Sequence, residues 1–410
     1  MQTPRVLAIV LAGGKGSRME VLTQERAKPT LPFGGVFTLL DLVLSNLRNS
    51  HIDDVWVTLQ YHASSVDPVL AHGRPWDLDR NIGGLRVLQP QEGLGDDEDG
   101  MAVGNTDTLF RFRGLIEDFA PDLVLMLSAD HAYKLDYRDV IAAHLANEAE
   151  CTVVTTTIDR DEADNHTLVH TQGARVTRVD HKPDGAETDT VATEVFVYDT
   201  DVLLGVLQKL FDALPEGEHL ADFGEDLLPA LVERGHTYAH RLRGYWRDLG
   251  RPSAYLAAHR ELLDGQVDIF DDPTGWPMLT ATAQRPGSHI TPEGTVSDSM
   301  IASGCTVSGA VERSVLGPGV VVEAGARVVD SIIMADTVIR AGAEVGWSIL
   351  DRRVTVGPEA RVGSMTRPAG SGRVHSEQVT LIGQRARIDG GAVVEAGERV
   401  APGGRRRRRT

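Results

Sequence analysis

Three glycines and four cationic side chains lie close together near the start of the sequence, in the stretch LAGGKGSRMEVLTQERAKP at 11–29. Glycines let a backbone approach a ligand closely and turn its N–H groups toward it, while lysines and arginines neutralise phosphate charge. The residues of this loop that could bind phosphates are Gly13, Gly14, Lys15, Gly16, Arg18 and Lys28. This set of groups is large enough to accept a nucleoside triphosphate.

Two widespread phosphate-binding motifs do not fit this loop. A Walker loop ends in Gly-Lys followed by Ser or Thr, whereas Lys15 is followed by Gly16. A dinucleotide-binding fingerprint needs a third glycine where this sequence has Met19. Taken alone, the loop is consistent either with a phosphate site or with a glycine-rich turn that carries solvated basic residues.

Two aspartates and a lysine in later segments could complete a phosphate-binding site. Asp130 follows the apolar run in DLVLMLSAD, and Asp248 lies between a candidate strand and a candidate helix in GYWRDLG. Two carboxylates from separate strand ends can hold Mg²⁺, which also binds phosphate oxygens. Lys182, in VDHKPDG, follows a short candidate strand and is placed to meet a second phosphate. Taken alone, a loop aspartate is more commonly a capping or turn residue, and a single lysine is more commonly a solvated side chain.

The elements that would position these residues alternate between strands and helices from residue 1 to residue 262. Buried-strand patterns occur at 6–11, 55–60, 122–130, 151–158 and 193–199, and helical spacing of apolar residues occurs at 38–50, 136–150 and 201–214. This alternation predicts an α/β domain with a mostly parallel sheet. Ligands of such a domain gather at the carboxyl ends of the strands, which is where Asp130 is expected to lie.

A different pattern begins after a connector at 263–294. Over 295–404, aliphatic residues recur at a six-residue step, at Ile301, Val307, Ile339, Val345, Val356, Val362, Ile388, Val394 and Val400. This period is typical of the hexapeptide coils of a parallel β-helix, and an irregular antiparallel β domain is the alternative. We expect MTRPAGSGRVHSEQ at 365–378 to be a loop that interrupts the coils, and RRRRRT at 405–410 to be a disordered basic tail.

Composition limits the classes of partner. The 410 residues carry a formal net charge of −18, which argues against binding to nucleic acids or to anionic membrane surfaces. The apolar run at 6–12 is too short to span a bilayer. The two cysteines, Cys151 and Cys305, have neither disulfide-framework nor metal-site spacing. We therefore expect a cytoplasmic protein in a reducing compartment.

Taken together and in this order, the segments resemble the sugar-1-phosphate nucleotidylyltransferases, most closely the ADP-glucose pyrophosphorylases. The resemblance covers nearly the whole chain and rests on LAGGKGSRMEVLTQERAKPTLPFGG, LDLVLSNLRNS, TLQY, LSADHAYKLDY, HKP, DFGEDLLPAL, YWRDLG and the hexapeptide repeats. It implies a Rossmann-like nucleotidyltransferase domain followed by a left-handed parallel β-helix. It also implies a reaction in which a nucleoside triphosphate and a sugar 1-phosphate give a nucleotide sugar and pyrophosphate.

The resemblance implies roles for the phosphate-binding residues. The glycine-rich turn at 13–16 would wrap the triphosphate, and Arg18 and Lys28 would stabilise the departing pyrophosphate. Asp130 and Asp248 would hold Mg²⁺. The reaction would be a direct in-line attack on the α-phosphorus, so catalysis would come from positioning and charge neutralisation.

The implied sugar and base contacts are where this sequence departs from the family. Lys182 would grip the phosphate of the sugar substrate. His181 replaces a glutamate expected to hold sugar hydroxyls, and Glu194 adds a carboxylate where the family has a Ser-Met-Gly segment. Contacts to the base are implied for Gln91, Gly104, Asn105 and Thr106. Val36 and Thr38 replace a basic pair associated with phosphorylated activators, which leaves allosteric activation open.

These features favour an active enzyme of the glucose-1-phosphate adenylyltransferase type with a diverged sugar pocket. Two alternatives remain open. One is the same chemistry on a modified sugar or cyclitol phosphate, for example valienol 1-phosphate with GTP, since Gln91 could pair with either purine. The other is a non-catalytic regulatory subunit. Because an open-ended β-helix exposes apolar edges, we also expect a homo-oligomer, either a tetramer or a dimer.

Overall fold

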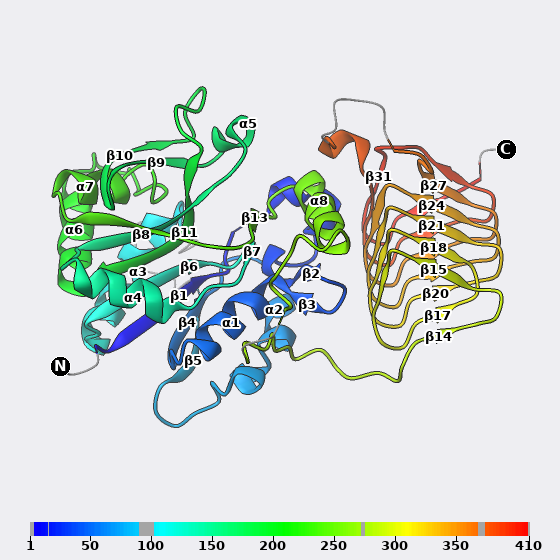
Figure 1. Cartoon of the computed structure of the whole chain (residues 1–410), viewed down its shortest axis with the longest axis horizontal. Helices are drawn as coiled ribbons and strands as arrows, with labels where there is room; N and C mark the ends of the chain where they lie inside the picture. The colour runs from blue at the N-terminus through cyan, green and yellow to red at the C-terminus, as the bar shows by residue number, and fades with distance from the viewer. Residues whose placement is uncertain (1–3, 15, 90–101, 272–274, 368–373, 409–410) are drawn as a thin grey trace.

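The computed structural model describes residues 4–14, 16–89, 102–271, 275–367 and 374–408. An α/β domain and a parallel β-helix lie side by side, with helix α8 (Pro252–Leu263) between them (Figure 1). The fold class expected from the sequence is therefore confirmed. No helix in the described part of the chain is both long enough and apolar enough to cross a membrane.

A nine-stranded sheet forms the centre of the α/β domain. Its order is β5 (Gly84–Leu88), β4 (Asp54–Thr58), β1 (Val6–Leu11), β6 (Leu123–Ser128), β11 (Thr190–Asp199), β8 (Cys151–Thr157), β12 (Thr237–Arg241), β10 (Arg175–His181) and β9 (Thr167–Gln172). The four strands from β5 to β6 pair in parallel, as do β8 and β12. The other pairings, made by β11 and β10, are antiparallel. The half of the sheet that leads into the glycine-rich loop is thus the parallel half.

Helices cover both faces of this sheet because its central strands are apolar on both sides. Along β1, Ala8 and Val10 are buried in one cluster, and Leu7 and Ile9 are buried in another. Helices on the first face are α1 (Leu39–Asn49), α2 (Ala63–Leu70) and α4 (Tyr137–Ala146). Helices on the second face are α3 (Asn105–Phe119), α6 (Thr200–Asp212) and α7 (Leu227–Glu233), while the short α5 (Arg160–Ala163) lies near β9 (Figure 1).

Short elements at the carboxyl end of the parallel strands shape the site. Strand β7 (His131–Tyr133) pairs antiparallel with β13 (Trp246–Asp248), which places Asp248 opposite His131. Strand β2 (Pro32–Phe33) pairs with β3 (Phe37–Thr38). Among the described residues, the 3₁₀ helices of the α/β domain are η1 (Ser17–Leu22), η2 (Lys28–Thr30) and η3 (Ala71–Trp76), and η4 (Ser376–Gln378) precedes β28 of the β-helix. Asp248 is therefore the last residue of a strand that runs antiparallel beside β7.

The β-helix consists of three parallel sheets whose strands are two or three residues long. The first contains β14 (His289–Ile290), β17 (Thr306–Val307), β20 (Val321–Val322), β23 (Val338–Ile339), β26 (Thr355–Val356), β29 (Arg387–Ile388) and β32 (Arg405–Arg406). The second contains β15 (Thr295–Ser297), β18 (Ala310–Glu312), β21 (Arg327–Val329), β24 (Glu344–Gly346), β27 (Arg361–Gly363) and β30 (Val393–Val394). The third contains β16 (Met300–Ile301), β19 (Val315–Leu316), β22 (Ile332–Ile333), β25 (Ser348–Leu350), β28 (Thr380–Ile382) and β31 (Arg399–Val400). The aliphatic residues of the six-residue period form its core, with Ile301 partly buried at one end.

The basic run at the end of the chain begins with a strand. Arg405 and Arg406 form β32, which pairs in parallel with β29. The Arg405 guanidinium also lies 2.9 Å from Asp389. Our expectation of a disordered tail from 405 onward is wrong for 405–408, because one more coil can extend the backbone ladder whatever its side chains are. At the other end, the first strand lies at 289–290, inside the predicted connector.

Candidate active site

The glycine-rich turn follows β1 and approaches β4. A Cβ added at Gly13 would lie 3.1 Å from Gln60, while one added at Gly14 would meet no atom within 4 Å. Gly16 has φ +63°, a conformation that favours glycine. The backbone conformation therefore favours glycine at Gly16, a side chain at Gly13 would press against Gln60, and Gly14 faces open space. Lys15 lies outside the described residues.

Lys28 lies between the two predicted metal-binding aspartates. Its Nζ is 2.6 Å from Asp130 Oδ2 and 3.5 Å from Asp248 Oδ1, and its side chain is 7% exposed. Burial alone would lower the pKa of Lys28, but the charges of the two aspartates overcome it and raise the pKa. Arg18 is exposed nearby, with its Nη2 3.3 Å from the position of a Cβ built on Gly250.

Both aspartates remain ionised although they are largely buried. Burial alone would raise their pKa values, but Lys28 and His131 lower the pKa of Asp130 and of Asp248. Ser128 also donates a hydrogen bond to Asp130. The sequence placed Asp130 at the end of β6, and the structure brings it together with Asp248 and Lys28.

His131 completes this group and was not singled out from the sequence. Its Nδ1 lies 3.0 Å from the Thr193 carbonyl oxygen, so Nδ1–H donates and Nε2 faces the aspartates. Nε2 is 3.3 Å from Asp130 Oδ1 and 3.8 Å from Asp248 Oδ1. Its position directly after Asp130 in LSADHAY could have indicated it. In a continuous strand the side chains of neighbouring residues point to opposite faces, but the chain bends at 129–130 between β6 and β7, so both side chains reach the same group.

These residues fit a divalent cation. Asp130, His131 and Asp248 each offer one ligand atom, and the three atoms lie within 4.8 Å of one another. Asp248 Oδ1 is buried and accepts no hydrogen bond from the described residues. A cation beside it would satisfy that oxygen.

Glu194 lies beside the same group because β11 is irregular there. The register of β11 against β8 shifts between Ala192 and Phe196, and Glu194 has φ +56°. Burial raises the pKa of its carboxyl, and the nearby charge of His131 offsets part of that rise. The sequence grouped Glu194 with the sugar contacts, and the structure places it in the electric field of Asp130 and His131.

The predicted sugar-phosphate residues lie at the end of β10. Lys182 has φ +42°, its side chain is 50% exposed, and its Nζ lies 3.9 Å from Asp222 Oδ2. The His181 Nδ1 lies 2.9 Å from Thr167 Oγ1, and its Nε2 lies 3.4 Å from Glu225 Oε1. Burial, together with the charge of Lys182, lowers the pKa of His181.

A single loop, 221–225, joins the predicted base contacts to this sugar-side group. Asp222 Oδ1 accepts a hydrogen bond from Asn105 N at 3.3 Å, and the Ala221 carbonyl accepts one from Thr106 N at 3.1 Å. A Cβ on Gly104 would lie 2.3 Å from the Ala221 oxygen. The start of α3 is therefore fixed against the loop that carries Asp222. The sequence did not indicate this contact.

Trp246 connects two groups of charged residues. The phosphate-side group consists of Lys28, Asp130, His131 and Asp248, and the sugar-side group consists of His181, Lys182, Asp222 and Glu225. Its ring makes edge-to-face contacts with His131, at 5.1 Å between centroids, and with His166, at 5.5 Å. The His166 carbonyl accepts a hydrogen bond from Lys182 N at 3.1 Å. Burial lowers the pKa of His166 to about 4. Trp246 and His166 thus link the strand that ends at Asp248 to the backbone of Lys182.

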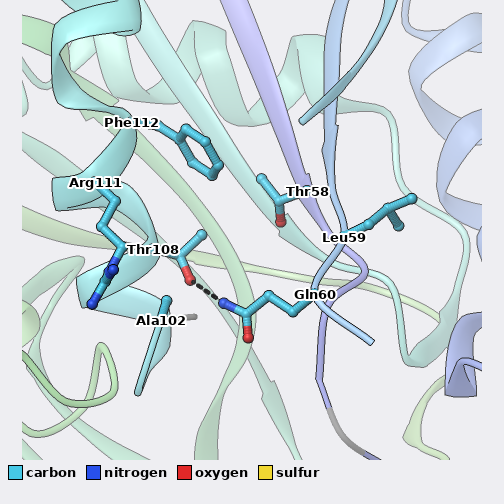
Figure 2. Close-up of a pocket in the computed structure, with 7 residues that line it drawn as sticks. All are labelled: Thr58, Leu59, Gln60, Ala102, Thr108, Arg111 and Phe112. Atoms are coloured by element: carbon cyan, nitrogen blue, oxygen red, sulfur yellow. Dashed lines mark hydrogen bonds between the residues drawn. The ribbon is translucent and has the colours of Figure 1, made fainter. Parts of the chain in front are cut away.

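A cavity opens between the end of β4 and helix α3 (Figure 2). It is lined by Thr58, Leu59, Gln60, Ala102, Thr108, Arg111 and Phe112. Gln60 Nε2 donates to Thr108 Oγ1 at 3.4 Å, and Gln60 also lies against Gly13. This amide lies beside the glycine-rich turn, where a nucleotide base could contact it. Gln91, the base contact expected from the sequence, lies outside the described residues.

Comparisons with known proteins agree with this architecture. Residues 7–265 match the nucleotidyl transferase family model, and residues 287–382 match the GlmU-like C-terminal hexapeptide model. The chain is 31% identical over 402 residues to the glucose-1-phosphate adenylyltransferase of Acetivibrio thermocellus, an alignment that covers 96% of this chain and 92% of that protein. It is 32% identical over 374 residues to the protein of the same name from Bacillus thuringiensis, which covers 90% of this chain and 96% of the relative. The chain therefore belongs to the nucleotidyl transferase family and is a nucleotidyltransferase with a C-terminal hexapeptide β-helix.

Proposed function

We propose that this enzyme transfers a nucleotidyl group from a nucleoside triphosphate to a sugar 1-phosphate, in the manner of a glucose-1-phosphate adenylyltransferase. The observation that carries the proposal is the convergence of Asp130 and Asp248 on Lys28, at the end of the glycine-rich loop. The named activity of the relatives supports the same reaction. The nucleotide would be ATP or GTP.

The residues of this chain would act mainly by position and charge. We propose that Asp130 and Asp248 hold Mg²⁺, which when bound would neutralise phosphate charge, and that His131 completes the site. Arg18 and Lys28 would stabilise the pyrophosphate as it leaves, because positive charge placed where negative charge develops lowers the barrier. Lys182 would bind the phosphate of the attacking substrate. That phosphate is largely ionised near neutral pH, so the mechanism needs no general base.

The second candidate function is the same reaction with a substrate other than glucose 1-phosphate, and the residues of the sugar pocket support it. His181 presents a largely buried imidazole next to Glu225 at 3.4 Å, and Glu194 adds a carboxylate near Asp130. A polar pocket rejects a ligand that leaves its buried groups unpaired, at a cost of about 1–3 kcal/mol for each group. A modified sugar or a cyclitol phosphate, such as valienol 1-phosphate with GTP, would match these groups differently from glucose.

The assembly and location also remain proposals. We propose a homo-oligomer, either a tetramer or a dimer, because the outer strands of an open-ended β-helix leave edges that a partner can cover; two of them, β14 and β30, carry Ile290 and Val393, which are exposed by 47% and 42%. Light scattering that gives only the mass of one chain would contradict it. The two cysteines are buried free thiols, which agrees with a reducing, cytoplasmic location.

A substrate matrix tests the proposed function. Five nucleoside triphosphates are combined with several hexose and cyclitol 1-phosphates, and pyrophosphate release is measured with Mg²⁺. We expect turnover with ATP or GTP and at least one of these phosphates. Nucleotide binding without turnover in any combination would instead support the regulatory-subunit alternative.

A further inference from the structure

The segment between Gly16 and Lys28 lies against the β-helix. We call residues 17–27 the docking loop. Its apolar side chains share one buried cluster with the β-helix, which includes Met19, Val21, Leu22, Ile332, Trp347 and Leu381. The residues on either side of the docking loop, Gly16 and Lys28, therefore belong to the candidate phosphate site, and the docking loop itself contributes to the interface between the domains.

A buried ion pair fixes the end of the docking loop next to Lys28. Arg26 donates from Nη2 to Asp351 Oδ1, and the two side chains are 6% and 1% exposed. Arg26 Nε also donates to the Leu22 carbonyl at 3.1 Å. The cost of desolvation makes such a pair a poor source of stability, but neither charge can be left without the other. The pair thus defines the path of the chain two residues before Lys28.

A second contact holds a strained residue near Gly16. Glu20 has φ 52° and ψ −125°, a conformation that persists only when the surroundings impose it. Arg399 donates to its two carboxylate oxygens, from Nε at 2.7 Å and from Nη2 at 2.9 Å. Arg399 is itself anchored, because it donates to the carbonyls of Ser376 at 2.8 Å and Val379 at 3.2 Å. The β-helix therefore maintains this strained turn.

A third contact lies between these two. Gln384 Nε2 donates to Glu25 Oε2 at 2.5 Å, and Arg385 pairs with the same carboxylate. Three separate coils of the β-helix thus contact the docking loop through residues 351, 384–385 and 399. By contrast, Lys182 pairs with Asp222, and His181 with Glu225, inside the α/β domain.

We propose that Asp351, Gln384 and Arg399 are positioning residues for the nucleoside triphosphate. They hold the docking loop so that the turn at Gly16 and the ammonium of Lys28 face one ligand before it arrives. This inference rests on the proposed function, which assigns the triphosphate to this loop. A loop that is ordered beforehand binds more tightly because less freedom is lost on binding.

The alternative is that these contacts only join the two domains. If the contacts are only structural, removing one should weaken the binding of both substrates to the same extent. If they position the docking loop, removing one should weaken nucleotide binding selectively, because the sugar-side residues contact other parts of the α/β domain. The ratio of the two effects therefore distinguishes the two roles.

The test uses the full chain with Glu20→Gln, Arg399→Gln and the double variant. Calorimetry measures binding of ATP and GTP with Mg²⁺, steady-state kinetics gives KM for the sugar 1-phosphate, and hydrogen exchange follows residues 17–28 without ligand. We expect nucleotide affinity to fall roughly tenfold in each single variant and no further in the double variant, because the two residues act as a pair. The KM for the sugar 1-phosphate should change less than about twofold, and exchange in the docking loop should be faster.

Arg340→Gln is the matched control, since it breaks the Arg340–Glu323 pair within the β-helix and should change none of these measurements. Arg399→Lys replaces Arg399→Gln if the latter does not fold. Because it keeps the charge but loses the paired donors, it should cause a smaller loss of nucleotide affinity and a smaller increase in hydrogen exchange. Unchanged affinity and exchange, or an equal loss for both substrates, would overturn the inference alone. A wild-type chain that binds neither nucleotide would overturn the proposed function as well.

Discussion

The phosphate side and the sugar side of the candidate site differ in how tightly their charges are enclosed. The Lys28 side chain is 7% exposed and lies 2.6 Å from Asp130. The Lys182 side chain is 50% exposed and lies 3.9 Å from Asp222. Charges interact more strongly where water is excluded, so members of the phosphate-side group depend on one another more than those of the sugar-side group do. A chain with this arrangement can change its sugar pocket one residue at a time without losing its phosphate chemistry.

Glu194 is the residue that crosses this division. The resemblance groups it with the sugar contacts, whereas the irregular register of β11 places its carboxyl where the charges of His131 and Asp130 act on it. A change in the pocket can therefore alter the phosphate side as well. The following variants test how far the two sides are independent.

Asp130→Asn should have the largest effect. It removes one charge from the buried group and one oxygen ligand, so turnover should fall by at least about 10³-fold while the fold is retained. Pyrophosphate release and circular dichroism measure the two properties. Asp118→Asn, at an exposed position of α3, is the matched control and should leave both unchanged. Turnover close to wild type would show that the cation site is elsewhere.

Lys182→Gln should have an intermediate effect, confined to the second substrate. A hydrogen bond to a charged group contributes about 1.5–3 kcal/mol, so the KM for the sugar 1-phosphate should rise by roughly 10- to 100-fold. Nucleotide affinity should change little, because Lys182 is partly exposed and lies at the end of β10. Exposed Lys209 in α6 provides the control variant Lys209→Gln. If nucleotide affinity falls as much as sugar affinity, the two sides are not separate.

Gly224→Ala should have a smaller effect on the same side. The added Cβ would lie 2.2 Å from His181 Nδ1, so the imidazole must move. A displacement of this kind should raise the KM for the sugar 1-phosphate by about tenfold. Gly205→Ala in α6, where an added Cβ meets nothing within 4 Å, is the control. In a His181→Ser background the alanine should have less effect; an undiminished effect would show that it acts through the backbone.

Local patterns in the sequence were sufficient to predict much of the fold. The six-residue period predicted the β-helix because each coil repeats the same contacts, and the apolar run before Asp130 predicted a strand end facing ligands. The basic run at 405–408 misled us because strand pairing uses the backbone, which charge patterns do not reveal. The mixed order of the sheet beyond β6 was equally invisible, since strand pairing depends on distant segments.

The parts of the site that sequence reasoning missed depend on contacts between distant residues. Asp222 caps Asn105 from 117 positions away, and Arg399 reaches Glu20 across 379 positions. No local periodicity records such pairs. His131 was missed for a different reason: it lies next to Asp130, but only the bend between β6 and β7 turns both side chains to one side.

The two histidines of the site provide the smallest and most direct comparison. Burial would lower the pKa of His131, but Asp130, Glu194 and Asp248 overcome burial and raise it. Burial and the charge of Lys182 lower the pKa of His181. A raised pKa contributes stability that is present below the unfolded value of about 6.5 and is lost as the pH rises through the folded pKa. A lowered pKa contributes stability that is present above about 6.5 and is lost as the pH falls through the folded pKa.

Urea unfolding of the metal-free chain between pH 5.5 and 8 should separate the two cases. The difference in free energy of unfolding between wild type and His131→Asn should become smaller as the pH rises. The corresponding difference between wild type and His181→Asn should become smaller as the pH falls. Each change should be about 1.4 kcal/mol for each unit by which the pKa is shifted. The exposed residue His289 supplies the control variant His289→Asn, which should show neither trend. Two slopes of the same sign would mean that the enclosing carboxylates do not dominate at His131, and that the phosphate side differs from the sugar side in burial alone.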